Sequence, residues 1–313
     1  MFQALPDKVR IREVGPRDGL QNEEQFVPTE AKKDFIRRLI DAGLQSIEIT
    51  SFVNPKWIPA LADCAEIGSE FSDIDSVTTN ALVPNMKGLD NAEAAGMKEI
   101  TLFMSASEGH NKANINKTIG ETLKLFGELL PTAKGRGMRV NAALSTAFGC
   151  PFEGDVPSEQ VAALTKELLD MGADEIGIAD TIGVANPLQV KQVMEMVLSL
   201  CEAKRIAVHF HDTYGTAVVN NVAAMEMGIT QFDAAVGGLG GCPYAPGASG
   251  NVPTEHLVYT FEKMGVDTGV DLEKLLQTAQ FIQDQLGHPL ASNGFRAWLG
   301  KKKHAEQKAE EAS

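Results

Sequence analysis

Apolar and polar positions along the chain follow a short unit that recurs five times. In each copy a helical stretch ends at a glycine, one residue follows, and a run of apolar and β-branched residues begins. The copies are AGLQSIEIT from Ala42, AGMKEITLF from Ala95, RGMRVNAAL from Arg136, MGADEIGIA from Met171 and MGITQFDAAV from Met227. Glycine accepts the left-handed conformation that ends a helix, so the chain turns straight into a strand. The repeat therefore predicts alternating helices and parallel strands.

The same pattern gives eight candidate strands. They begin near Arg10, Ser46, Asp75, Glu99, Met138, Asp174, Arg205 and Gln231. Helical patterns follow them, for example over 29–42, 158–171 and 187–200, the last with Asn186 as a good N-cap before Pro187. Eight such units predict an α/β fold, a (β/α)8 TIM barrel. A doubly wound open sheet is the alternative, but no Gly-x-Gly-x-x-Gly follows the first strand.

The length of the chain fits one barrel with additions at its C-terminal end. Such barrels run to about 250 residues as a single domain, and this chain has 313 residues. Residues 271–286 predict an extra helix, and the charged tail over 300–313, GKKKHAEQKAEEAS, predicts a frayed helix or a disordered segment. We expect a single barrel domain over 1–313 with additional C-terminal helices.

Composition limits the kinds of partner that we expect the protein to bind and the cell compartment in which we expect it. A net charge of −14 predicts a surface that repels nucleic acid and anionic membranes, so an anionic substrate needs a local cluster of positive charge. No segment approaches the roughly 20 apolar residues of a membrane span, and the N-terminus has no apolar signal region. The four cysteines, Cys64, Cys150, Cys201 and Cys242, are too widely spaced for a disulfide framework, which suits a reducing cytosol. We expect a cytoplasmic protein.

Polar residues fall where the strands end, which in a TIM barrel is the face that carries the active site. They are Arg17 and Asp18 after strand one, Glu48 within strand two, Asp180 at the end of strand six, His209 and His211 at the end of strand seven, and Cys242 and Asn251 after strand eight. The sequence therefore predicts a polar site at this end of the barrel.

The His-x-His pair is the most informative part of this set. His209 and His211 are two residues apart, so both imidazoles point to the same side of the strand. With Asp18 and Asn251 they offer mixed nitrogen and oxygen ligands, which suit Mg²⁺ or Mn²⁺ more than structural zinc. Two hydrogen-bonded histidines in a polar barrel mouth are the alternative.

Two acidic residues and a glycine-rich loop complete the candidate site. A buried carboxylate needs a partner, and Arg17 is the obvious one for Glu48. Asp180 could orient a metal-bound histidine. Residues 237–251 hold six glycines, two prolines and Cys242, which favours a thiol on a lid above the metal over a plain surface loop.

Six motifs in order resemble the 3-hydroxy-3-methylglutaryl-CoA (HMG-CoA) lyases, which are DRE-TIM metallolyases. They are VGPRDGLQNE from Val14, EITSFVNPKWIP from Glu48, GCPFEG from Gly149, GIADTIGVANP from Gly177, HFHDTYGTA from His209 and GLGGCPYAPGASGN from Gly238. The likeness runs from about Val9 to Leu286. It implies a divalent-metal-dependent enzyme that cleaves HMG-CoA to acetyl-CoA and acetoacetate, as in leucine degradation, and that forms a homodimer.

The resemblance also assigns roles to individual residues. Asp18, His209, His211 and Asn251 match the metal ligands, Arg17 matches the arginine that stabilises the enolate, and Cys242 matches the catalytic cysteine; Glu48 and Asp180 match acidic residues of the same site. His209 or Asp18 is the expected base for the substrate 3-hydroxyl.

Other activities remain open on this fold. Claisen-condensing synthases and 4-hydroxy-2-oxoacid aldolases resemble the chain in the Arg-Asp and His-x-His motifs, but are not expected to use the Cys242 thiol. A lyase for a longer branched 3-hydroxyglutaryl-CoA, such as the isohexenyl compound, is a closer alternative. A barrel that only binds metal or CoA is the non-catalytic one.

Overall fold

The computed structural model describes residues 5–241 and 250–311, which form a closed barrel of eight strands. The strands are β1 Arg10–Glu13, β2 Ser46–Ser51, β3 Thr78–Leu82, β4 Glu99–Ser105, β5 Arg139–Ser145, β6 Glu175–Asp180, β7 Ile206–Phe210 and β8 Gln231–Ala234. Each strand is parallel to both neighbours, and β8 closes the barrel on β1 in the register Arg10 to Gln231. The predicted (β/α)8 barrel is confirmed.

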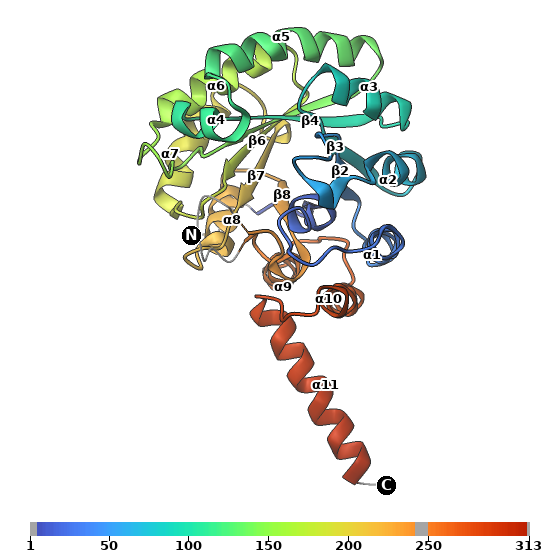
Figure 1. The fold of residues 1–313 in the computed structure, drawn as a ribbon. Coiled ribbons are helices and arrows are strands. Elements are labelled where there is room, and N and C mark those ends of the chain that lie inside the picture. The colour runs from blue at the N-terminus through green and yellow to red at the C-terminus, as the bar shows by residue number, and fades with distance from the viewer. Residues whose placement is uncertain (1–4, 242–249, 312–313) are drawn as a thin grey trace.

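Helices follow the strands and cover the outside of the barrel (Figure 1). They are α1 Thr29–Asp41, α2 Cys64–Phe71, α3 Met86–Ala94, α4 Glu108–Ile115, α5 Ile119–Gly135, α6 Ser158–Asp170, α7 Pro187–Leu198, α8 Ala217–Glu226, α9 Thr254–Lys263, α10 Leu272–Leu286 and α11 Asn293–Glu311, with shorter turns η1 Gly15–Gly19, η2 Pro59–Leu61, η3 Ala203–Arg205 and η4 Val236–Gly238. Asn186 caps α7, as expected, by accepting from the backbone N–H groups of Leu188 and Gln189.

The third strand begins at Thr78 rather than at Asp75, because the preceding residues form the turn that leads into it. For the tail, a frayed helix or a disordered segment was expected, and the structure shows a helix to Glu311 as part of α11. Its first turns are anchored, since Phe295 is buried and Trp298 donates to Glu273 at 2.9 Å.

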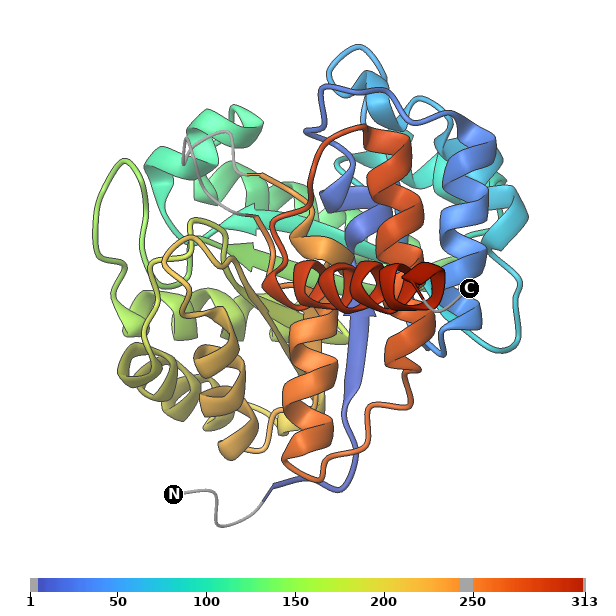
Figure 2. The same ribbon diagram turned by 90° about the horizontal axis from the view of Figure 1, so that it is seen from below.

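The additional C-terminal helices pack on one side of the barrel. The helix α10 lies beside α1 in both views, and α11 extends away from the barrel (Figures 1 and 2). Within the described ranges, no helix combines the length and apolar character needed to cross a bilayer. These additions leave the C-terminal ends of the strands for the candidate site.

Candidate active site

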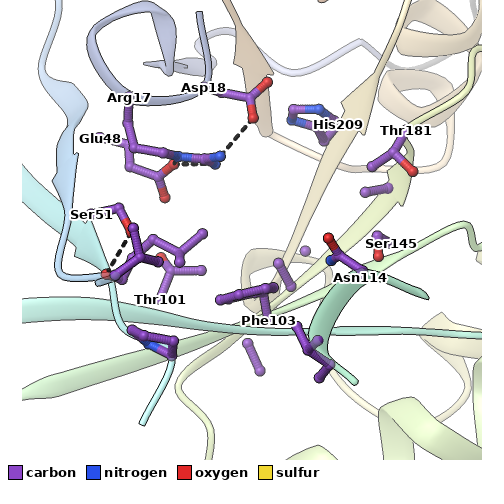
Figure 3. Close-up of a pocket in the computed structure, with 18 of the residues that line it drawn as sticks. Arg17, Asp18, Glu48, Ser51, Thr101, Phe103, Asn114, Ser145, Thr181 and His209 are labelled. Carbon is purple, nitrogen blue, oxygen red and sulfur yellow. Dashed lines mark hydrogen bonds and ion pairs between the residues drawn. The ribbon is translucent and has the colours of Figure 1, made fainter. Parts of the chain in front are cut away.

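The first part of the site is the η1 turn, which carries Arg17 and Asp18 directly after β1. Arg17 Nη1 donates to Asp18 Oδ1 at 2.6 Å, and the same guanidinium is hydrogen-bonded to Glu48 on β2 (Figure 3). Glu48 is 3% exposed. The expected pairing of Glu48 with Arg17 is therefore present, and it fixes the guanidinium beside Asp18.

The second part is a cluster of metal-ligating groups. Ligand atoms of Asp18, His209 and His211 all lie within 4.8 Å of one another. Asn251 Nδ2 donates to Asp18 Oδ2 at 2.7 Å, while its Oδ1 is buried and has no hydrogen-bond partner among the described residues. An orphaned amide oxygen beside a carboxylate and two imidazoles fits a divalent ion that takes oxygen and nitrogen ligands. The structure thus brings together the four residues that the sequence analysis proposed as metal ligands.

The electrostatic environment keeps two of these side chains, Asp18 and His211, in the protonation state that a metal ligand needs. Burial opposes ionisation of Asp18, but Arg17, followed by His209 and His211, lowers its pKa to about 2. Burial, together with the neighbouring His209, lowers the pKa of His211 to about 3. Asp18 is therefore ionised and His211 neutral near pH 7, as metal ligands must be.

His209 is held by a residue that the sequence analysis did not single out. Its Nδ1 lies 3.4 Å from Asp233 Oδ2, and Arg12 Nε donates to Asp233 Oδ1 at 2.9 Å. Burial lowers the pKa of His209, but Asp233 and then Asp18 outweigh it and raise the pKa. The available signal was the charged residues inside two predicted strands, which include Arg12 in RIREVG and Asp233 in QFDAAV.

The orienting contact expected of Asp180 is made by Asp233 instead. Asp180 is fully buried at the end of β6, and its carboxylate accepts from the backbone N–H groups of Val184 and Ala185 at 3.1 and 2.7 Å. Its contacts therefore stabilise the loop between β6 and α7, because the carboxylate accepts from two backbone donors of that loop, of which that of Ala185 is buried.

A cavity of about 660 Å³ opens beside these groups. Its polar end is lined by Arg17, Asp18, Glu48, His209, His211 and Thr181; its apolar wall is lined by Leu82, Pro84, Phe103, Ile115, Leu125 and Phe126. Figure 3 shows Arg17, Asp18 and His209 on one side of this space and Phe103 on the opposite side. A few convergent polar groups in a largely apolar cavity are typical of a small-molecule site.

The glycine-rich segment reaches the same cavity. Gly241 lines it, and Cys242, the next residue, lies outside the described residues. Gly240 and Gly250 have φ of +96° and +88°, and a side chain at Gly250 would collide with the backbone of Gly240. The backbone therefore makes a close approach to itself at the two ends of this loop.

Cys150, a second thiol that follows a strand end, that of β5, does not reach this cavity. It is 4% exposed, it is not among the residues that line the cavity, and Ser107 Oγ donates to its Sγ at 2.9 Å. Its position favours a packing role.

A closed (β/α)8 barrel with carboxylate, imidazole and guanidinium groups at the C-terminal ends of its strands defines an enzyme of the TIM-barrel class. The model of the HMGL-like family matches residues 8–282. A hydroxymethylglutaryl-CoA lyase of Bacillus subtilis is 51% identical over 94% of this chain and 98% of its own length. The chain belongs to the HMGL-like family, and the resemblance drawn from the six motifs is confirmed.

Solved structures agree with this assignment. The crystal structure of the Bacillus subtilis HMG-CoA lyase superposes with a TM-score of 0.92, at 50% identity, and the match covers 95% of this chain and 99% of that one. An HMG-CoA lyase from Acinetobacter baumannii, solved in complex with coenzyme A and 3-methylmalate, gives a TM-score of 0.88 at 42% identity, covering 93% of this chain and 95% of that one.

Proposed function

We propose that the protein is a divalent-metal-dependent carbon–carbon lyase that cleaves HMG-CoA to acetyl-CoA and acetoacetate. One observation carries the proposal. Asp18 is hydrogen-bonded to both Arg17 and Asn251, and its carboxylate lies within 4.8 Å of the ring nitrogens of His209 and His211 that could bind the same metal ion. The Arg17 guanidinium, which can stabilise an enolate, and the proposed metal ligands therefore surround the Asp18 carboxylate at the polar end of the cavity. The high identity to named HMG-CoA lyases over most of the chain supports this reading.

Asp18, His209, His211 and Asn251 are the residues that would hold the metal, Mg²⁺ or Mn²⁺. Bound there, a divalent ion supplies Lewis acidity, which lowers the pKa of a hydroxyl that coordinates to it. The lyase solved with coenzyme A supports an acyl-CoA as the substrate.

Different residues of the chain then act at the successive steps of the reaction. A base takes the proton of the substrate 3-hydroxyl, and Asp18 and His209 are the two candidates for this step. The C3–O bond becomes the ketone of acetoacetate as the C2–C3 bond breaks, and the electron pair of that bond passes into the thioester as an enolate. Arg17, fixed by Glu48 and Asp18, stabilises the negative charge on the thioester oxygen.

An acid must finally protonate the enolate carbon to give acetyl-CoA. We assign this step to Cys242, since Gly241 lines the cavity one residue earlier and Cys150 does not line it. A catalytic role for Asp180 stays a prediction, as do a homodimer, a cytoplasmic location and a place in leucine degradation.

The decisive experiment is an assay of acetoacetate after incubating the protein with Mg²⁺ or Mn²⁺ and HMG-CoA. A parallel reaction with the longer isohexenyl compound tests the alternative substrate. Release of acetoacetate at a kcat/KM well above that for the longer compound supports the proposal. Absence of acetoacetate with either metal overturns it.

A further inference from the structure

Glu13, the last residue of β1, contacts three segments that carry the candidate site. It is fully buried, and its Oε1 accepts from the backbone N–H groups of Gly15 and Val236, both at 2.9 Å. Its Oε2 accepts from the hydroxyl of Thr254 at 2.6 Å. Gly15 opens η1, Val236 opens η4 at the start of the glycine-rich segment, and Thr254 opens α9 three residues after Asn251. One side chain therefore joins all three segments.

A second buried acid continues this arrangement. Glu255 Oε2 accepts from the backbone N–H of Gly237 at 3.0 Å, while its Oε1 has no hydrogen-bond partner in the described part of the chain. Gly237 has φ of +71°, and a side chain there would collide with Leu290. Consecutive N–H groups at the start of the glycine-rich segment are thus bonded to two different carboxyl groups, and only Glu13 also reaches the η1 turn.

Glu13 can keep its hydrogen bonds in either charge state. Burial raises the pKa of Glu13 to about 7, although the bonds from Thr254, Val236 and Gly15 lower it. All three bonds survive protonation, because the hydroxyl of Thr254 can accept as well as donate. The fit is also tight, since a Cβ at Gly15 would lie 2.5 Å from Glu13 Oε1.

We infer that Glu13 is a positioning residue, which fixes the Arg17–Asp18 turn relative to the glycine-rich segment and to Asn251. Its effect on turnover rests on the proposed function, whereas its effect on metal binding does not. Without it, two buried backbone donors lose their acceptor, and the turn that carries Asp18 loses its link to the segment that ends at Asn251.

The test compares Glu13→Ala with Glu13→Gln, using Mn²⁺ binding followed by electron paramagnetic resonance and the acetoacetate assay. The amide oxygen of Gln accepts from Gly15 and Val236 and its amide nitrogen donates to Thr254, so both readouts should stay within about threefold of the parent. Glu13→Ala should weaken Mn²⁺ binding at least about tenfold and lower kcat about a hundredfold. Glu255→Gln is the matched control, because it keeps an acceptor for Gly237, and it should resemble the parent.

A second measurement keeps the inference testable if Glu13→Ala does not fold. Gly15→Ala retains the carboxyl group but displaces it, and should speed amide hydrogen exchange at Val236, which lies far away in sequence. Unchanged exchange at Val236, or Mn²⁺ binding by Glu13→Ala equal to that of the parent, overturns the inference. Equal losses in Glu13→Gln and Glu13→Ala would instead show that charge is required. If the parent makes no acetoacetate, the proposed function fails alone, and the Mn²⁺ and exchange measurements still decide the role of Glu13.

Discussion

Asp233 lies 3.4 Å from Nδ1 of His209, and this contact leaves Nε2 as the nitrogen available to a ligand. A histidine that binds a metal commonly gives its other N–H to a carboxylate, which fixes both the tautomer and the ring orientation. Arg12 holds Asp233 in turn and also donates to Glu175 at 2.9 Å. Residues on β1, β6 and β8 thus orient His209, the proposed metal ligand on β7, and the closure of the barrel brings these residues together.

Replacing Asp233 by Asn should weaken Mn²⁺ binding about 10- to 100-fold, the range seen when an outer partner of a metal ligand is lost. Both carboxylate oxygens accept, one from Arg12 and one from His209, whereas an amide offers only one acceptor. Titration calorimetry measures the change. Asp267→Asn, an exposed position paired with Lys8, is the control and should bind Mn²⁺ like the parent. If Asp233→Asn bound Mn²⁺ with the affinity of the parent, Asp233 would have no role in metal binding.

Turnover should depend on a divalent metal ion. A chelator should abolish turnover, and Mg²⁺ or Mn²⁺ should restore it; full turnover in chelator contradicts the proposal.

The affinity for the metal should depend on pH through His209. Asp233 raises the pKa of His209 above its ordinary 6.5, although burial opposes the shift. Protons therefore compete with the metal at His209, so affinity should fall as the pH drops through that raised pKa. In Asp233→Asn the fall should move to lower pH, and a Mn²⁺ titration between pH 5 and 8 tests both statements.

The polar residues at the strand ends could be predicted as site residues from the sequence, because each follows or ends an apolar run that reads as a strand. Arg17 and Asp18 follow a strand directly, and His209 and His211 share a face through the period-two geometry of a strand. Asp233 and Glu13 were missed for a physical reason. Each is an acid within a strand, and one of its partners lies far away in sequence: Arg12 meets Asp233, and Val236 meets Glu13, only when β8 pairs with β1.

The partner of Asp180 could not be predicted for a related reason. A buried acid at a strand end can accept either from a side chain across the barrel or from the backbone of its own loop. The local path of the loop after β6, which presents the N–H groups of Val184 and Ala185, decides between them. That path depends on packing against neighbouring loops, and a short motif does not specify it.

Arg17→Gln should lower kcat by at least about a hundredfold, the order of loss when a donor to a developing oxyanion is removed. Metal affinity and KM should change much less, because the four proposed ligands remain. Arg17→Lys tests geometry at constant charge: a single ammonium cannot contact Glu48 and Asp18 as the guanidinium does, so it should recover only part of the rate. If KM rose while kcat was kept, Arg17 would be a substrate-binding residue instead.

Cys242→Ser should lower kcat by several orders of magnitude while folding and Mn²⁺ binding persist. The reason is the sequence position of Cys242, which directly follows Gly241, a residue that lines the cavity. Cys150→Ser is the matched control, because Cys150 is buried against Ser107 outside the cavity lining, and its variant should keep near-normal turnover. Alkylation should inactivate the parent, and substrate should slow it, because Gly241, the residue before Cys242, lines the cavity that the substrate would fill. Near-normal turnover in Cys242→Ser, with loss in Cys150→Ser, would move the proton donor from the glycine-rich segment to the loop after β5.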